Sequence, residues 1–429
     1  MTEQSAQPAE SAPVTVLDGS YEGAVKVRGP LLRLLVWTLP AYAAVWIIGG
    51  AVSGLLLGLQ VNDLDPENKV TNLAVVVTSA SVVSLVAQPL GGLLSDRTRS
   101  RFGRRAPWLV GGATVGGAAL VAMGFMHELA GITILWAVSQ GAYALSSGPL
   151  TAVIPDRVPR RARGSFAAVS GLGAVVAGVA GSFLGSAFRD LIVPGYLTIA
   201  AGIVVIMVLF CVFNRDTSSR DLEIAPFRWR DVLRAYWVSP IAHPDFFWAF
   251  LGRLLLYLGY ALVTSYSLYL LIDYIGLGRD GAAAFAPFMT LAAIPLGLVA
   301  LLVSGPLSDR LNRRKAFIFA ASTFIAVALV VPWVWPTTTG IIVMNVILGI
   351  GFGLFQSVDT ALITEVLPSS ATFAKDLGVL NIASFIPGTI APGIAALIIS
   401  LGGYAALFPF GIVFALLGSF AVWFIRSVR

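Results

Sequence analysis

Long apolar segments separated by short polar loops dominate the chain. Most of them are at least about 18 residues long, enough for an α-helix to cross roughly 30 Å of hydrocarbon. Barrel strands would alternate apolar and polar residues, whereas these segments are apolar throughout. Because lipid offers no partner to backbone polar groups, helices are the expected elements. We predict twelve spans, at residues 33–60, 71–95, 107–127, 131–154, 164–188, 192–213, 245–272, 282–304, 315–335, 338–364, 376–400 and 403–425.

Basic residues fall almost entirely on one side of these spans. Of the 28 Lys and Arg residues, 24 lie in the two tails and in the loops after even-numbered spans, whereas only Lys69, Arg189 and Arg279 lie in the opposite loops. The positive-inside rule makes the first set cytoplasmic and places both ends of the chain inside. The net charge of +6 therefore reports membrane topology, and we expect no nucleic-acid partner. With 57% hydrophobic and only 12% charged residues, the chain is expected to be a multi-pass membrane protein.

A loop motif recurs after about half the chain. The pattern GxLSDR at residues 92–97 reappears at 305–310, and TAVIPDRVP at 151–159 parallels TALITEVLP at 360–368. Each half thus carries matched loops after its second span and matched exits from its fourth. We predict a flexible cytoplasmic tail at 1–30, a six-helix half at 31–213, a cytoplasmic loop between the halves at 214–244, and a second six-helix half at 245–429.

The first copy of the motif, followed by Arg104 and Arg105, resembles the signature loop of the major facilitator superfamily. Its longer form, DRTRSRFGRRAPW at 96–108 after QPLG at 88–91, resembles the branch of glycoside–pentoside–hexuronide cation symporters and sucrose transporters. GRL at 252–254 and KDLGVLN at 375–381 are similar to the same branch. The resemblance implies an all-α membrane protein with twelve helices in two pseudo-symmetric halves, and transport by alternating access.

The resemblance also implies a gating role for the repeated loop. In the family, the acid of the motif interacts across the seam between the halves, near the start of helix 11, in one state and not in the other. An acid there would favour the positive end of a helix dipole. The alternative is a basic loop that only anchors the topology at anionic lipid. The candidate gating residues are Gly92, Asp96, Arg97, Arg101, Arg104, Arg105, Asp309 and Arg310.

Polar and aromatic residues form single helical faces on the first, fourth, seventh and tenth spans. Besides the candidates named below, these faces include Gln60 on the first span, Arg253 on the seventh, and Phe352 and Asp359 on the tenth. These are the helices that line the cavity in the superfamily. Aromatic faces beside amides and hydroxyls suit a neutral polyol such as a sugar, whereas the alternative is that Trp and Tyr anchor the span ends. The candidate substrate-binding residues are Tyr42, Trp46, Gln140, Tyr143, Tyr257, Tyr260, Asn345 and Gln356.

Two opposite charges lie inside predicted spans, Arg253 in the seventh and Asp359 in the tenth. A charge at mid-membrane costs about 2.5–3.5 kcal/mol on the insertion scale, so pairing is expected. We hypothesise an Arg253–Asp359 ion pair that titrates during transport and links proton binding to substrate binding. The alternative is a static pair that locks the two helices together. Unlike the melibiose-permease relatives, the second span has no acid before Asp96, which argues against a sodium site of that kind.

The expected function is proton-coupled symport of a sugar or glycoside in the bacterial cytoplasmic membrane. The alternative is an efflux antiporter for drugs or metabolites, a group with a Gly-Pro motif in helix 5, where span 164–188 has no proline. An enzyme is not expected, because no nucleophile–base or metal constellation appears, and Cys211 is the only cysteine. We expect no cofactor and no metal, a small-molecule substrate with a proton, contact with the lipid bilayer, and a monomer.

Overall fold

The structure is a computed structural model that describes residues 27–220, 243–311, 313–366 and 373–425, and the side chains of residues 309, 360–366 and 373–381 lie outside that description. The described part consists of helices and their connections, with no strand. The helices are α1 (Pro30–Ile48), a π-helical segment (Gly49–Leu56), α2 (Leu57–Leu64), α3 (Lys69–Asp96), α4 (Ala106–Gly124), α5 (Leu129–Arg157), α6 (Arg163–Ala187), α7 (Ile192–Phe213), α9 (Pro244–Thr264), α10 (Ser267–Tyr269), a second π-helical segment (Leu270–Tyr274), α11 (Gly278–Leu311), α12 (Arg314–Val334), α13 (Thr338–Val366), α14 (Phe373–Gly402) and α15 (Leu407–Trp423), with 3-10 turns at Arg160–Ala162 and Tyr404–Ala406.

Twelve spans within the described residues are long and apolar enough to cross a membrane. The predicted all-α fold with twelve spans is therefore confirmed. The first span is a composite, because α1, the π-helical segment and α2 run on as one stretch from Pro30 to Leu64.

The seventh span differs from its prediction, which ran unbroken to residue 272. Helix α9 ends at Thr264, and α10 and a π-helical segment follow it. The hydroxyls of Thr264 and Ser265 donate to the carbonyls of Tyr260 and Ala261, one turn back. Tyr266 then leaves the helical conformation, with φ −114° and ψ 21°, and the apolar run alone does not reveal this break.

The two sets of six spans repeat the same helix pairings. In the first set α3 packs on α5, α4 on α5, α4 on α7, α1 on α7 and α1 on α6. In the second set the equivalent helices pack alike, with α11 on α13, α12 on α13, α12 on α15, α9 on α15 and α9 on α14. This is the packing that a duplicated six-helix unit gives. We refer to α1–α7 as the first half and to α9–α15 as the second half.

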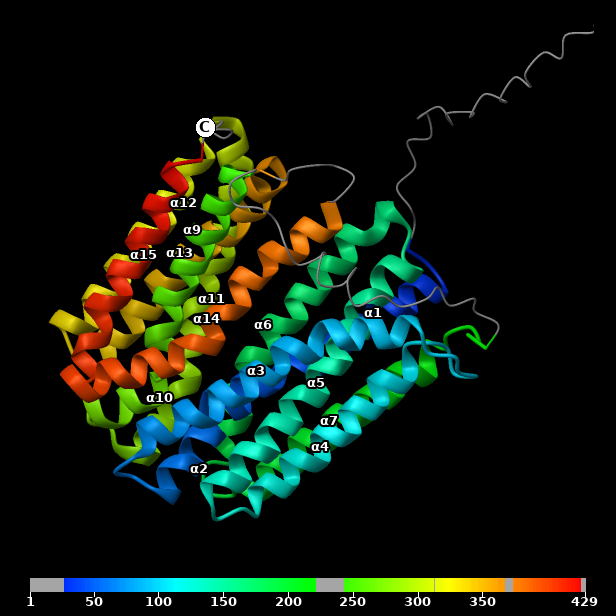
Figure 1. Cartoon of the computed structure of the whole chain (residues 1–429), viewed down its shortest axis with the longest axis horizontal. Helices are drawn as coiled ribbons and strands as arrows, with labels where there is room; N and C mark the ends of the chain where they lie inside the picture. The colour runs from blue at the N-terminus through cyan, green and yellow to red at the C-terminus, as the bar shows by residue number, and fades with distance from the viewer. Residues whose placement is uncertain (1–26, 221–242, 312, 367–372, 426–429) are drawn as a thin grey trace, which may run out of the picture.

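The halves meet through one pair of helices on each side. Helix α3 packs against α14, and α6 packs against α11 (Figure 1). By the repeated pairings, α3 is equivalent to α11 and α6 is equivalent to α14. The two contacts are therefore equivalent to each other, which relates the halves by an approximate two-fold axis. The structure therefore has a central seam that runs between helices of different halves.

The two ends of the bundle carry different charges. The Lys69 end is the end where α2 meets α3 and where α11 begins, and it holds Lys69, Arg189 and Arg279. The Asp96 end is the opposite end, where α3 ends and α4 begins. At the Lys69 end, hydrogen bonds from the side chain and backbone of Asn68 hold the pKa of Asp65 below its usual value, and they close the turn between α2 and α3.

Candidate functional site

The second half presents a face of polar and aromatic side chains between α9 and α13. Arg253, Tyr257 and Tyr260 follow one another at intervals of four and three residues on α9, which places them on one side of the helix. Phe352, Phe355, Gln356 and Asp359 form the facing side of α13. Six of these seven residues belong to the stripes that periodicity predicted, and Phe355 is the addition.

Arg253 and Asp359 form the ion pair expected from the sequence. The Arg253 Nε atom lies 3.4 Å from Asp359 Oδ2, and the two side chains are only 10% and 7% exposed. The buried Nε atom nevertheless makes no hydrogen bond with the described residues. The two charges therefore compensate each other at a distance slightly longer than a good charge-assisted hydrogen bond, which is about 2.7–2.9 Å.

The ring of Tyr257 lies beside this ion pair on α9. The guanidinium carbon of Arg253 lies 5.9 Å from the centre of the Tyr257 ring, within the range of a cation–π contact. The Tyr257 hydroxyl donates to Gln356 Oε1 over 3.2 Å. A continuous chain of contacts thus runs from Asp359 through Arg253 and Tyr257 to Gln356, whose side chain is exposed.

Phe352 connects the second tyrosine to the same group. Its ring stacks on Tyr260 with centroids 5.4 Å apart, and it meets Tyr257 edge-on at 5.8 Å. Phe355 meets Tyr257 from another side at 5.7 Å. These packed rings restrict the rotamers of both tyrosines, and such pairs contribute about 0.5–1.5 kcal/mol each beyond buried area.

Two glycines fix the backbone that carries the ion pair and the tyrosines. A Cβ atom on Gly252 would lie 2.9 Å from the Gly418 carbonyl oxygen, and one on Gly259 would lie 2.6 Å from that of Gly411. Glycine at both positions lets α9 approach α15 at backbone contact. Arg253 and Tyr260 directly follow these glycines in sequence, so the close helix contact sets their positions.

The candidates in the first half are not gathered in the same way. Tyr143 is 4% exposed and its ring lies against Gly116 and Gly117 of α4. It therefore points into the first half rather than toward the seam, and its hydroxyl has no hydrogen-bond partner among the described residues. Trp46 is 53% exposed, whereas Tyr42 and Gln140 are partly buried.

Two further polar residues of the cavity stripes serve local contacts. Asn345 donates from Nδ2 to the Ile341 carbonyl of its own helix over 2.9 Å. Gln60, which shares the α1–α2 stripe, donates to the Met123 carbonyl and accepts from the Tyr196 hydroxyl, each over 2.9 Å. Periodicity identified a polar face on the first span, but the side-chain amide of Gln60 on that face makes its hydrogen bonds inside the first half.

At the Asp96 end, Arg104 and Arg105, which follow the first copy of the repeated motif, bind two carboxylates of their own half. Arg105 approaches Asp96 at 2.7 Å and Asp156 at 2.9 Å, and donates to Ser95 Oγ over 2.5 Å. Arg104 lies 2.8 Å from Asp156 and 3.7 Å from Asp96. The side chain of Arg105 is 7% exposed, so this residue is the buried centre of the cluster.

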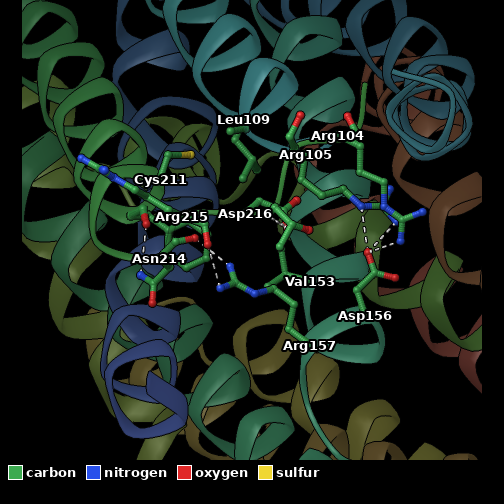
Figure 2. A pocket seen from close by; sticks show the side chains of 15 residues that line it. Arg104, Arg105, Leu109, Val153, Asp156, Arg157, Cys211, Asn214, Arg215 and Asp216 are labelled. Carbon is green, nitrogen blue, oxygen red and sulfur yellow. Dashed lines mark hydrogen bonds and ion pairs between the residues drawn. The ribbon is translucent and has the colours of Figure 1, made fainter. Parts of the chain in front are cut away.

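The sequence singled out Asp156 only as part of the repeat, and the structure adds it to the arginine cluster. Its position at the exit of the fourth span is the signal that could have found it, because the exit of α5 lies beside the start of α4. Figure 2 shows Arg104 and Arg105 converging on Asp156. A cavity of about 350 Å³ adjoins the cluster and is lined by the ends of α5 and α7 as well.

The remaining gating candidates have separate positions. Arg101 lies over the Phe102 ring at 4.6 Å, and Gly92 has open space where a side chain would be. Arg310 is exposed near the end of α11, and the side chain of Asp309 lies outside the described residues, as do those at the start of α14. The expected contact of Asp96 across the seam stays a prediction, because the partners seen here belong to its own half.

In the described part of the chain, no group of three or more His, Cys, Asp and Glu residues is arranged to hold a metal ion. The contacts of the candidate site are those of the ion pair, the tyrosines and the amide of Gln356.

Comparisons with known proteins agree on the fold. The sequence model of the Major Facilitator Superfamily matches residues 34–374 and 289–429. No curated protein sequence matches the chain. The crystal structure of a mutant of the nucleoside transporter NupG is similar with a TM-score of 0.73 at 11% identity, over 92% of this chain and 100% of that one. The D-xylose-proton symporter reaches a TM-score of 0.69 at 14% identity, over 94% and 98%. A bacterial homologue of the human lysosomal transporter Spinster, inward-facing and occupied, reaches 0.66 at 13% identity, over 93% and 96%.

Proposed function

The chain belongs to the Major Facilitator Superfamily, a family of transporters, and on that premise we propose that it moves a sugar or glycoside by proton-coupled symport with alternating access. In this proposal the Asp96 end faces the cytoplasm of a bacterial cell, as the distribution of basic residues indicates. The ends of the solute path open in turn as the two halves tilt about their seam. The protein is a membrane transporter and not an enzyme.

The observation that carries the proposal is the α9–α13 face. It combines a compensated charge pair with hydroxyl, amide and aromatic groups within one chain of contacts. Rings of Tyr260 and Phe352 offer apolar surface for the C–H face of a sugar ring, while Gln356 and Tyr257 offer hydrogen bonds to its hydroxyls. A neutral, polyhydroxylated solute fits this mixture, because it carries no charge that the pair must neutralise.

In this proposal, proton and substrate binding are coupled because the ionisation of Asp359 depends on the position of Arg253. While the guanidinium stays near, the carboxylate is stabilised in its ionised form by the opposite charge. A substrate that engages Arg253 or Tyr257 draws the cation away, and a buried carboxylate left alone favours its protonated form. Substrate and proton then bind with one shared coupling free energy, which acts equally in both directions.

A ligand screen followed by transport assays tests the function. The purified protein is heated with monosaccharides, disaccharides, glycosides, nucleosides and amphipathic drugs, and the ligand that raises its melting temperature is tested for counterflow in proteoliposomes. We expect a polyhydroxylated neutral ligand to stabilise the protein, to exchange, and to accumulate when a proton gradient is imposed. If amphipathic drugs alone stabilise the protein and no sugar or glycoside does, the proposed symport is wrong and drug efflux becomes the favoured function.

A further inference from the structure

The Lys69 end has few basic residues, and two of them join the halves. Lys69, Arg189 and Arg279 are the three Lys and Arg residues that sequence places in the loops on this side. Lys69 belongs to the first half and Arg279 to the second. Each reaches carboxylates of the opposite half, whereas the Arg189 side chain meets its neighbour Asp190 at 3.4 Å.

Lys69 is the more buried of the two bridging cations. Its side chain is 12% exposed, and Nζ lies 2.8 Å from Asp273 Oδ1 of the second half. The second oxygen of Asp273 accepts from the Tyr404 hydroxyl over 2.6 Å. Lys69 also donates to Asn62 of its own half over 3.2 Å. A lysine is rarely this buried unless it is paired, so this ion pair fixes the start of α3 against the second half.

Arg279 makes the reverse connection at the start of α11. Its guanidinium binds Asp63 through two nitrogens, at 2.8 and 2.7 Å, which is the bidentate geometry that arginine and carboxylate favour. It also lies 3.2 Å from Asp190 and donates to the Arg189 carbonyl over 3.0 Å. Three groups of the first half therefore hold one cation of the second half.

The Asp96 end contrasts with this arrangement. Its described carboxylate pairs, formed by Asp96 and Asp156 with Arg104 and Arg105, lie within the first half. A tilt that separates the halves at the Lys69 end would break both cation bridges at once, because each half supplies one cation and accepts the other. The same tilt would leave the Asp96–Asp156 cluster intact.

We propose that Lys69–Asp273 and Arg279–Asp63 form a reciprocal latch that favours the state closed at the Lys69 end. The inference rests on the alternating access of the proposed function. It assigns these residues a role in the equilibrium between the states closed and open at the Lys69 end, rather than in solute binding. Neutral hydrogen bonds also cross here, from the Tyr269 hydroxyl to the Gly58 carbonyl and from the Tyr266 hydroxyl to the Val70 carbonyl. Latch variants should therefore still close, but less often.

A distance measurement between the halves tests the latch without any substrate. The background is Cys211→Ser, which removes the single cysteine, and spin labels are placed on the exposed positions Glu128 and Thr339. We expect Lys69→Gln combined with Arg279→Gln to raise the ratio of long to short label distances roughly three- to tenfold, the effect of a few partly exposed ion pairs. High salt should raise the ratio in the wild-type chain and less in the double variant, because screening weakens the more exposed of the two pairs, Arg279–Asp63.

Arg189→Gln is the matched control, because it removes a basic residue of the same end whose side chain does not bridge the halves. Arg279→Asp alone should lower the closed population. Adding Asp63→Arg exchanges the two charges and should restore part of it. An unchanged distance ratio in the double variant, or an equal change in the control, overturns the latch. The salt response of the wild-type chain decides the question even if the double variant does not fold. Because no solute is involved, absence of sugar transport would count against the proposed function alone.

Discussion

At the scale of single residues, the Arg253–Asp359 pair is the feature that most constrains function. Either charge alone within the membrane would cost several kcal/mol, and removal of one partner of a buried pair is typically destabilising by about 3–5 kcal/mol. The pair sits beside hydroxyl and amide groups rather than within a purely apolar contact. A static lock between α9 and α13 remains the alternative to a coupling site, and the Asp359 variants distinguish the two.

We expect Asp359→Asn to separate transport from coupling. The variant should retain substrate counterflow but lose accumulation driven by a proton gradient, because its amide cannot take up the proton. Uptake into proteoliposomes with and without an imposed pH gradient measures both activities. Asp359→Glu serves as the control that restores the carboxylate. Full proton-driven accumulation by Asp359→Asn would rule out the titrating pair.

At the scale of the elements, close helix contacts determine where the site residues lie. Helix α9 lies at backbone distance from α15 because Gly252 and Gly259 meet Gly418 and Gly411. The same device recurs in the first half, where a Cβ on Gly181 would lie 2.7 Å from the Ile47 carbonyl oxygen of α1. Small residues thus set the spacing between α9 and α15 in the second half and between α1 and α6 in the first.

We expect Gly259→Leu to destabilise the protein by about 1–3 kcal/mol, the usual effect of overpacking. Its Cβ atom alone would lie 2.6 Å from the Gly411 oxygen and 2.9 Å from the Ala415 nitrogen, so α9 must move away from α15. Thermal unfolding of the purified variant measures the effect. Gly202→Leu is the control, because that glycine has open space around it. Equal melting temperatures for the two variants would contradict the argument.

At the scale of the whole molecule, two halves with repeated packing meet along one seam, and their ends differ in charge. The described polar bridges at the Lys69 end cross between halves, while the described carboxylate clusters of the Asp96 end stay within the first half. The structure is therefore held together across the seam at the Lys69 end.

We predict that the Asp96 end faces the cytoplasm. In a Cys211→Ser background, a cysteine at the exposed position Glu128 should react with a membrane-impermeant maleimide added to intact cells. A cysteine at Phe102, which is 59% exposed at the Asp96 end, should react only after the cells are permeabilised. The reverse pattern would show that the positive-inside assignment is wrong.

The sequence by itself determined the number of spans, and its repeated loop motif indicated two halves of six spans each. Hydrophobic length fixes the number of spans, because a helix needs about 20 apolar residues to cross the bilayer. Periodicity placed Arg253 and Tyr257 on one face of the seventh span and Asp359 on one face of the tenth. The apolar run did not reveal the break of the seventh span after Thr264, where the backbone of Tyr266 leaves the helical conformation.

Only the tertiary structure decided which polar residues meet. Tyr143 and Gln60 occupy the same kind of stripe as Tyr257, yet they lie against α4 and the Met123 carbonyl. A stripe defines one face of a helix. The rotation of that helix against its neighbours decides which residues that face contacts. The bridges of Lys69 and Arg279 join residues about 200 positions apart, and such pairings follow from how the halves pack rather than from any pattern along the chain.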